Sequence, residues 1–361
     1  MFSKRLLSIT PYTPGEQPQN KKYIKLNTNE NPYPPSPNVS TALKEFADNP
    51  QVLRLYPDPQ STTLRLAIAN YYNINQESVF VGNGSDEVLA MSFFAFFDSN
   101  DGPLLFPSLT YSFYPVYCNF YNIDYLQVPL KEDFTISIDD YLNEEKSCGI
   151  IITNPNAPTG IALPLQEIKR LLDNYDKDRV VIIDEAYIDF GAESAVSLIN
   201  QYKNLLIVQT FSKGHSLAGL RLGYAIADKE LILALHTAKD SFNSYPADRI
   251  AQQLGAIAIN DVEYFKRTTS SIIKTREWFS NTIKEMGYFV LPSSTNFVFL
   301  KHPTILAEVL YKKLKERGIL VRWFSDPLIC NFLRITIGLD SEMKELVCAL
   351  KDIEDEQFRH S

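Results

Sequence analysis

The stretch "TFSKGHSLAGLRLG" at Thr210–Gly223 decides the fold of this chain. It follows the apolar run "LLIVQ" at 205–209, which has the length and continuous apolar character of a buried strand. Lys213 then stands between a serine and a glycine, where that strand ends. A lysine is strongly hydrated, so at the mouth of a buried strand it requires a charged partner, a shifted pKa or a covalent attachment. The stretch therefore predicts a lysine with a function at the edge of a sheet.

Similar apolar runs surround this strand in the middle of the chain. "GIIIT" at 149–153 and "VVIID" at 180–184 have strand length, and the apolar residues of 165–175 between them follow a helical period of 3.6. A further strand at 78–81 leads into a glycine-containing turn and a helix start. Strands that are apolar on both faces and joined by amphipathic helices indicate an α/β fold, with a parallel sheet covered by helices on both sides.

The length of the chain and the changes in its residue pattern predict about two domains. The chain has 361 residues, 45% of them apolar, which is enough to bury a sizeable core. Residues 1–40 are rich in Pro, Asn, Ser and Tyr and predict an extended arm. We predict an arm that joins the small domain at 1–34, a large domain at 35–250 that contains the parallel sheet, and a small α+β domain at 251–361. The last of these is predicted to contain a helical stretch at 252–287, a strand at 296–300 and helices at 304–317 and 341–353.

The composition excludes several classes of function. The net charge of −8 argues against binding of nucleic acid or an anionic membrane, since both need a basic face. The four cysteines show no metal-ligand spacing, which predicts reduced thiols and no metal. The first residues contain too short an apolar run for a secretory signal, and no window approaches the roughly 18 apolar residues of a membrane span. We therefore expect a cytoplasmic protein.

The predicted central strands all end in polar residues. In an open α/β sheet the ligand crevice lies outside the carboxyl ends of the strands. Each signal is weak alone, because a terminal Asp is often a helix cap and most lysines are surface charges. Together the strand ends predict one site at one edge of the sheet. The segments are "GNGSDE" at 82–87, "NPNAPTG" at 154–160, "DEAYIDF" at 184–190 and "TFSKGH" at 210–215.

The residue types in these segments suit pyridoxal phosphate. A partly desolvated lysine amine forms Schiff bases with carbonyls, and this cofactor offers an aldehyde together with a ring nitrogen that needs an acidic partner. Lys213 supplies the amine and Asp184 the acid, while Tyr187 can hydrogen-bond the ring oxygen. The donors predicted for the cofactor phosphate are the backbone N–H groups of Ser85 and Asp86 at a helix start and the side chains of Ser212 and Arg221.

Two other interpretations of these segments receive less support. "GNG" can open a dinucleotide fingerprint, but G-x-G-x-x-G needs a glycine where Glu87 stands. His215 lies beside the lysine, but it has neither metal spacing nor a triad partner, so we interpret it as structural.

Four of the motifs also resemble a known family. "TFSKGHSLAGLRLGY" closely resembles the lysine signature of the fold-type I pyridoxal-phosphate aminotransferases, and "NPNAPTG", "DEAYIDF" and "FLRITIG" occur in that family's order over nearly the whole chain. "ITPYTPG" at 9–15, "KLNTNENPYPPSP" at 25–37 and "RLYPDP" at 54–59 are similar to the N-terminal pattern of the histidinol-phosphate aminotransferase subgroup. The resemblance implies a large domain with a mostly parallel, seven-stranded sheet. It also implies transamination between L-histidinol phosphate and 2-oxoglutarate, giving imidazole acetol phosphate and glutamate in histidine biosynthesis.

The resemblance also implies roles for individual residues. Lys213 is expected to form the Schiff base and to carry the proton. The chain is expected to be a homodimer in which Tyr56 reaches the partner's cofactor phosphate. The other expected contacts are Asp184 and Tyr187 on the ring nitrogen and oxygen, Tyr111 on the ring face, Ser85, Asp86, Ser212 and Arg221 on the phosphate, Arg334 on the substrate carboxylate, and Arg322 and Tyr12 on the substrate phosphate.

The chain departs from the family pattern at three places. The family has an asparagine on the ring oxygen where this chain has Ala157, so either Asn156 makes the contact or Tyr187 works alone. Pro34 stands where many members have glycine, and "FNSYPAD" at 242–248 differs from the usual Phe-Asn-Val-Asn. These last two departures bear on the substrate more than on the cofactor.

Structural roles and related activities stay open. Arg334 can be a cross-strand charge, Tyr111 a core residue, and Tyr12 and Tyr56 surface tyrosines of a proline-rich arm. The rival enzymes are an aromatic-amino-acid aminotransferase and a threonine-phosphate decarboxylase. A cofactor-carrying regulator without turnover is the rival from another class, but the acidic chain shows no spare basic region for DNA binding.

Overall fold

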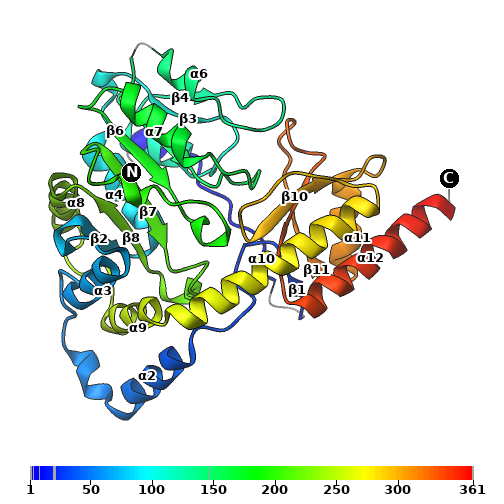
Figure 1. The fold of residues 1–361 in the computed structure, drawn as a ribbon, viewed down its shortest axis with the longest axis horizontal. Coiled ribbons are helices and arrows are strands. Elements are labelled where there is room, and N and C mark those ends of the chain that lie inside the picture. Colours follow the sequence, from blue (N-terminus) through cyan, green and yellow to red (C-terminus); the bar gives the residue numbers. More distant parts are fainter. Residues whose placement is uncertain (1, 3, 8, 19–21, 145, 360–361) are drawn as a thin grey trace.

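The computed structural model describes residues 2, 4–7, 9–18, 22–144 and 146–359. Figure 1 shows two lobes joined by the long helix α10 (Val262–Glu285). The large lobe is a seven-stranded sheet with its helices, and the small lobe holds the C-terminal elements together with the strand β1 (Ile24–Lys25) of the arm. The domain boundaries proposed from the sequence stay a prediction, and their outer ends at residues 1 and 361 lie outside the described residues.

The sheet of the large lobe confirms the predicted α/β architecture. Its strand order is β2-β8-β7-β6-β5-β3-β4, and all neighbouring strands are parallel except that β8 runs antiparallel to β2 and β7. The strands are β2 (Val79–Gly82), β3 (Leu104–Pro107), β4 (Tyr125–Val128), β5 (Gly149–Thr153), β6 (Val180–Asp184), β7 (Leu205–Thr210) and β8 (Gly223–Ala227).

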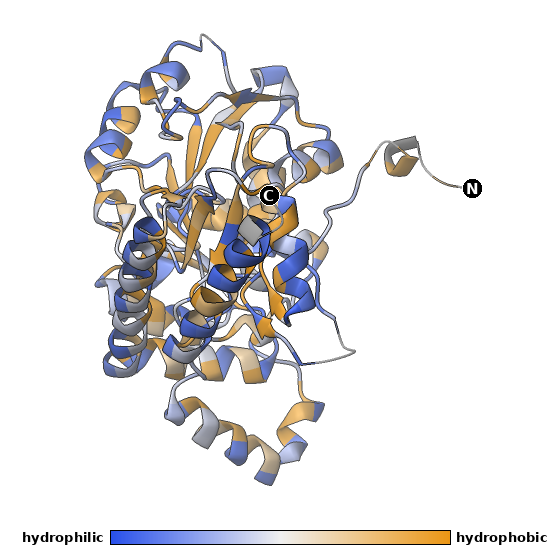
Figure 2. Cartoon of the chain, turned by 90° about the vertical axis from the view of Figure 1, so that its right-hand side faces the viewer, coloured by the Kyte–Doolittle hydropathy of each residue, from blue (hydrophilic) through white to orange (hydrophobic). Residues whose placement is uncertain are grey.

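Helices cover both faces of this sheet, which explains why its strands are apolar on both sides. Ile150 and Ile152 of β5 pack in one core with α3, α7 and α9, while Ile151 between them packs in another core with α4, α5 and α8. Figure 2 shows the hydrophobic strands enclosed by helices with hydrophilic outer faces. The helices are α2 (Pro37–Asp48), α3 (Thr62–Tyr72), α4 (Gly84–Phe96), α5 (Tyr114–Tyr121), α6 (Ile138–Leu142), α7 (Leu165–Asn174), α8 (Lys229–Phe242) and α9 (Arg249–Asn260).

The small lobe is built on a four-stranded antiparallel sheet of order β12-β13-β10-β9. Beside it, β1 of the arm pairs in parallel with β11, and Leu26 of the arm enters the core of the lobe. The chain thus returns to its own N-terminal segment. The elements, apart from α10 and β1, are β9 (Phe289–Val290), β10 (Phe297–Lys301), β11 (Ile319–Leu320), β12 (Arg322–Trp323), β13 (Leu333–Thr336), α11 (Ala307–Glu316) and α12 (Asp340–Arg359).

Two predictions about local structure were wrong. The helical stretch predicted at 252–287 is two helices, because Asp261 leaves helical geometry between α9 and α10 and caps α10 by accepting the N–H of Tyr264. The arm predicted at 1–40 includes the short helix α1 (Lys4–Leu7) and the start of α2, which has Pro37 at its first position after the N-cap Ser36.

No helix in the described ranges is long and apolar enough to cross a membrane. A cytoplasmic location stays a prediction.

Candidate active site

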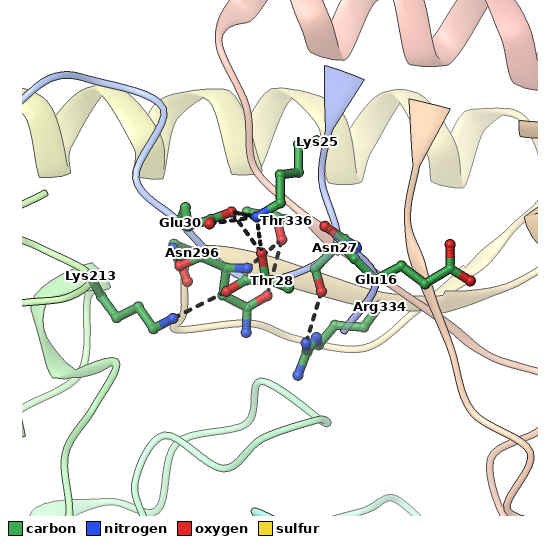
Figure 3. A network of polar contacts seen from close by, with 10 residues as sticks. Glu16, Lys25, Asn27, Thr28, Glu30, Lys213, Asn296, Arg334 and Thr336 are labelled. Carbon is green, nitrogen blue, oxygen red and sulfur yellow. Dashed lines mark hydrogen bonds and ion pairs between the residues drawn. The ribbon is translucent and has the colours of Figure 1, made fainter. Parts of the chain in front are cut away.

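Lys213 lies in the loop after β7 and faces the arm. Its Nζ donates to the backbone carbonyl of Thr28 at 3.2 Å (Figure 3). The same atom lies 5.8 Å from the centre of the Tyr187 ring. Burial, followed by the nearby positive charge of Arg334, lowers the pKa of the amine to about 8. A lysine at this pKa has a substantial neutral fraction at physiological pH, and the neutral amine is the nucleophilic form.

Asp184 ends β6 in a buried position at the same edge of the sheet. Its Oδ2 accepts the hydroxyl of Tyr114 at 2.8 Å, and its Oδ1 accepts the backbone N–H of Ala186 at 3.2 Å. Burial raises the pKa of this carboxyl to about 6. A carboxylate has about four acceptor positions, so it can still take a cationic donor.

Tyr114 is a residue of this site that the sequence analysis missed. Its hydroxyl lies 2.7 Å from Oγ1 of Thr153 in addition to its bond with Asp184, and its ring meets the edge of Tyr111 at 5.6 Å. The signal was present in "PSLTYSFY", where a second tyrosine follows Tyr111 by three residues. Only the packing shows that this second tyrosine orients the acid.

The opposite end of the site is the start of α4. Ser85 and Asp86 lie in its first turn, as predicted, and Asp86 pairs with Arg221 at 3.0 Å and accepts the hydroxyl of Tyr111 at 2.8 Å. Arg221 also approaches Oγ of Ser212 at 3.4 Å. The first residue of the helix, Gly84, has a φ of +80°, and a Cβ there would lie 2.5 Å from the Arg221 guanidinium. The positive φ is the feature that favours glycine here, since the end of the Arg221 side chain could shift.

The small lobe contributes two arginines that face each other. Arg322 of β12 is paired in register with Arg334 of β13, and both guanidinium groups lie over the ring of Phe324. Nη2 of Arg334 donates to the carbonyl of Asn27 at 3.2 Å, whereas its buried Nε has no acceptor among the described residues. Like charges directly opposite each other destabilise a sheet, so this pair favours an anionic ligand.

Three predicted residues make no hydrogen bond to the groups named above within the described chain, although Tyr12 meets the network through its ring contact with Tyr111. Asn156 uses its amide on the carbonyl of Leu109 and on Thr159, and its Oδ1 has no partner in the described chain. Tyr12 packs on Phe113 and lies 6.3 Å from Tyr111, ring to ring. The Tyr56 side chain is 78% exposed. The assignment of each to a ligand stays a prediction.

Lys213, Asp184 and the start of α4 thus lie at the ends of strands at one edge of the sheet, and the arm segment that Lys213 contacts at Thr28 also binds Arg334 at Asn27. The family model for class I and II aminotransferases matches residues 21–350. The chain belongs to this aminotransferase family. Its predicted fold-type I architecture is confirmed.

Individual relatives narrow the family further. Histidinol-phosphate aminotransferase of Syntrophus aciditrophicus (strain SB) is 54% identical over 97% of both chains, and that of Clostridium botulinum (strain Okra / Type B1) is 52% identical over 96% of both. The crystal structure of histidinol-phosphate aminotransferase from Sinorhizobium meliloti in complex with pyridoxal-5'-phosphate has a TM-score of 0.88 and covers 99% of this chain and 98% of its own. At 22% identity that likeness shows the fold.

The residues of this aminotransferase site fit pyridoxal phosphate. Lys213 presents an amine of lowered pKa, and Asp184 is a buried acid that a protonated ring nitrogen would stabilise. The start of α4 offers backbone N–H groups beside Arg221, which is the arrangement that binds phosphate at a helix N-terminus. The half-buried Tyr187 faces the amine and has a hydroxyl for the ring oxygen.

The lowered pKa of Lys213 predicts how its amine reacts in protein freed of cofactor. Acetylation of Lys213 by acetic anhydride, followed by mass spectrometry of its peptide, is expected to be half-maximal near pH 8, because only the neutral amine reacts. Ordinary surface lysines serve as the internal control and react with a midpoint at about pH 10.4. Arg334→Gln is expected to move the Lys213 midpoint upward, since it removes a neighbouring cation. A midpoint equal to that of the surface lysines would contradict the assignment.

Proposed function

We propose that this enzyme transfers the amino group of L-histidinol phosphate to 2-oxoglutarate, giving imidazole acetol phosphate and glutamate, with pyridoxal phosphate as its cofactor. The observation that carries this proposal is the full-length similarity, at 54% and 52% identity, to proteins named histidinol-phosphate aminotransferase. The site supports it, because it combines the groups for the cofactor with a pair of arginines for an anionic substrate.

Each catalytic group has a defined task at a stated atom. When bound, pyridoxal phosphate supplies an aldehyde that joins amines covalently and a ring that accepts the electrons released at the substrate Cα. Lys213 Nζ would take the proton from the substrate Cα and pass it to the aldehyde carbon of the cofactor, C4′, rather than back to Cα, and its pKa of about 8 allows this close to neutral pH. Asp184 would hold the ring nitrogen in its protonated form, and Tyr114 keeps that carboxylate oriented.

Arg334 and Arg322 provide the means to bind both substrates. Glutamate and 2-oxoglutarate carry a carboxylate, for which the Nε of Arg334, unpartnered among the described residues, is a suitable donor. Histidinol phosphate has no carboxylate, and its phosphate dianion requires more donors. Arg322, directly opposite in the strand pair, supplies the second guanidinium, and Tyr12 adds a hydroxyl.

We propose that the chain works as a homodimer and that Tyr56 reaches the cofactor phosphate of the partner. The segment around Tyr56 is held on one side, because Arg249 binds the carbonyl of Tyr56 at 2.6 Å and the Tyr56 ring stacks on Tyr245 at 4.7 Å. Its apolar side chains are largely open to solvent, since Leu55 and Tyr56 are 51% and 78% exposed. The short helix α1 near the N-terminus lies away from the rest of the chain (Figure 2), as the end of an arm that embraces a second copy would.

Amino-donor profiling with 2-oxoglutarate tests the function directly. The purified enzyme is expected to form glutamate fastest with L-histidinol phosphate, and Lys213→Ala to lower the rate at least about 10³-fold while the protein stays folded. Lys229→Ala, on the exposed start of α8, is the control and is expected to keep the wild-type rate. Preference for phenylalanine or tyrosine would indicate an aromatic aminotransferase, carbon dioxide release a decarboxylase, and no turnover with any donor a regulator.

Arg322→Ala tests the phosphate contact of the substrate. We expect the KM for histidinol phosphate to rise about tenfold or more, because a charge-assisted bond to the dianion is lost, and the KM for glutamate to change less than about threefold. Arg317 in the same lobe pairs with Glu356 instead, so the control Arg317→Ala is expected to leave both values unchanged. Equal losses for the two substrates would show that Arg322 is not a phosphate clamp.

Mixed dimers test whether Tyr56 acts across the interface. Tyr56→Ala is expected to weaken cofactor binding about tenfold, and Lys213→Ala to inactivate its own site. When the two variants are co-expressed, a mixed dimer has one site with both native residues if Tyr56 comes from the partner, so activity returns. If Tyr56 serves its own protomer, no such site exists and activity stays at the level of the Tyr56→Ala protein.

A further inference from the structure

Asn29 of the arm is a buried residue in which every polar group is bonded. It adopts the left-handed conformation with a φ of +57°, which asparagine tolerates better than most residues. Its backbone N–H donates to Oγ1 of Thr336 at 3.0 Å, and its carbonyl accepts the amide of Asn296 at 2.9 Å. Figure 3 shows Thr336 and Asn296 converging on this part of the arm, between the lysine and the arginine of the site. Both the N–H and the carbonyl of Asn29 are therefore held by hydrogen bonds.

The side chain of Asn29 connects this anchored segment to Tyr187. The hydroxyl of Thr336 donates to Oδ1 of Asn29 at 3.1 Å, which places the amide nitrogen on the opposite side. Nδ2 of Asn29 then donates to the hydroxyl oxygen of Tyr187 at 2.9 Å. Because Tyr187 accepts this bond, its own proton is not used on Asn29 and is available for a second acceptor.

We propose that Asn29 is a positioning residue that directs the Tyr187 hydroxyl proton toward the ring oxygen of the cofactor. The inference rests on the proposed function and concerns a residue for which neither the sequence motifs nor the family resemblance gave a role. It acts through Tyr187 and does not itself contact the cofactor. The amide makes the phenol a better donor, because a phenol that accepts a hydrogen bond is polarised toward giving up its own proton.

Two features make the direction of this proton important in this chain. Ala157 stands at the position from which the family's asparagine contacts the ring oxygen, and the amide of Asn156 is already bonded to Leu109 and Thr159. Tyr187 is thus the donor that the described residues leave for the ring oxygen. If the Tyr187 hydroxyl pointed its proton elsewhere, the ring oxygen would lose this hydrogen-bond donor.

The charges around Tyr187 bear on any titration of the site. Lys213 lies over its ring, and Arg334, Asp184 and Asp86 all influence the phenol electrostatically. Its ring neighbour Phe297 of β10 meets it edge-on at 5.1 Å and carries no charge. A test must therefore separate the hydrogen bond from these charges.

The deciding measurement is the pH dependence of the bound cofactor's visible absorption. Asn29→Asp preserves size, the left-handed conformation and the acceptor for Thr336, but it replaces the donor to Tyr187 by a competing acceptor. A hydrogen bond donated by Tyr187 to the ring oxygen favours the deprotonated form of the bound cofactor. Loss of this bond should therefore raise the midpoint of the absorption titration by about one pH unit. In a Tyr187→Phe background there is no hydroxyl proton to redirect, so Asn29→Asp should shift the midpoint much less. The part of the shift that comes from the charge of the new carboxylate acting through space is the same in both backgrounds.

Controls separate positioning from a merely structural role. Asn296→Ala removes the donor to the Asn29 carbonyl but keeps both side-chain bonds of Asn29, so it is expected to lower thermal stability and leave the midpoint unchanged. If Asn29→Asp fails to fold, Asn29→Gly keeps the backbone conformation and should shift the midpoint in the same direction by a smaller amount.

The outcomes distinguish this inference from the function on which it rests. A shift of equal size with and without the Tyr187→Phe substitution, or no shift when Tyr187 is present, would overturn the role of Asn29. A wild-type protein that binds no pyridoxal phosphate shows no absorption band at all and overturns the proposed function itself.

Discussion

The withdrawal of the Lys213 amine from water is the constraint on which the rest of the site depends. The ammonium form of a shielded lysine costs free energy, and the pKa of about 8 expresses that cost. The protein offsets this free-energy cost only in part, through the carbonyl of Thr28 and the more distant negative charge of Glu30. An amine held in this state is ready to be a nucleophile and a proton carrier, which are the two tasks that transamination requires of it.

The arm contacts residues of both lobes and so connects their parts of the candidate site. Its backbone carbonyls at residues 27, 28 and 29 accept donors from Arg334, Lys213 and Asn296, which come from different elements of the fold (Figure 3). Its neighbouring strand β1 belongs to the small lobe through β11. A segment that binds the lysine of one lobe and the arginine of the other aligns the cofactor groups with the substrate groups.

Much of the fold was predictable from local pattern, since strands buried on both faces give continuous apolar runs that stand out in the sequence. The strands at 149–153 and 180–184 were located to the residue, and the last strand before the lysine to within one. The break at Asp261 was not predicted, because the apolar period continues through it, and what stops the helix is a side-chain cap held in place by contacts with Ser36 and Asn38. The residues named from their position at strand ends, such as Asp184 and Lys213, do lie at one edge of the sheet.

The sequence by itself determined the α/β class, the family and the positions of Asp184 and Lys213 at strand ends, because these depend on residue type at fixed distances along the chain. Only the tertiary structure decided which polar side chains orient them. Tyr114 reaches Asp184 across 70 residues, and Asn29 reaches Tyr187 across 158. The opposition of Arg322 and Arg334 likewise arises from strand register. The physical reason is that a hydrogen bond between distant residues depends on packing and angle in three dimensions, which leave no periodic trace in the sequence.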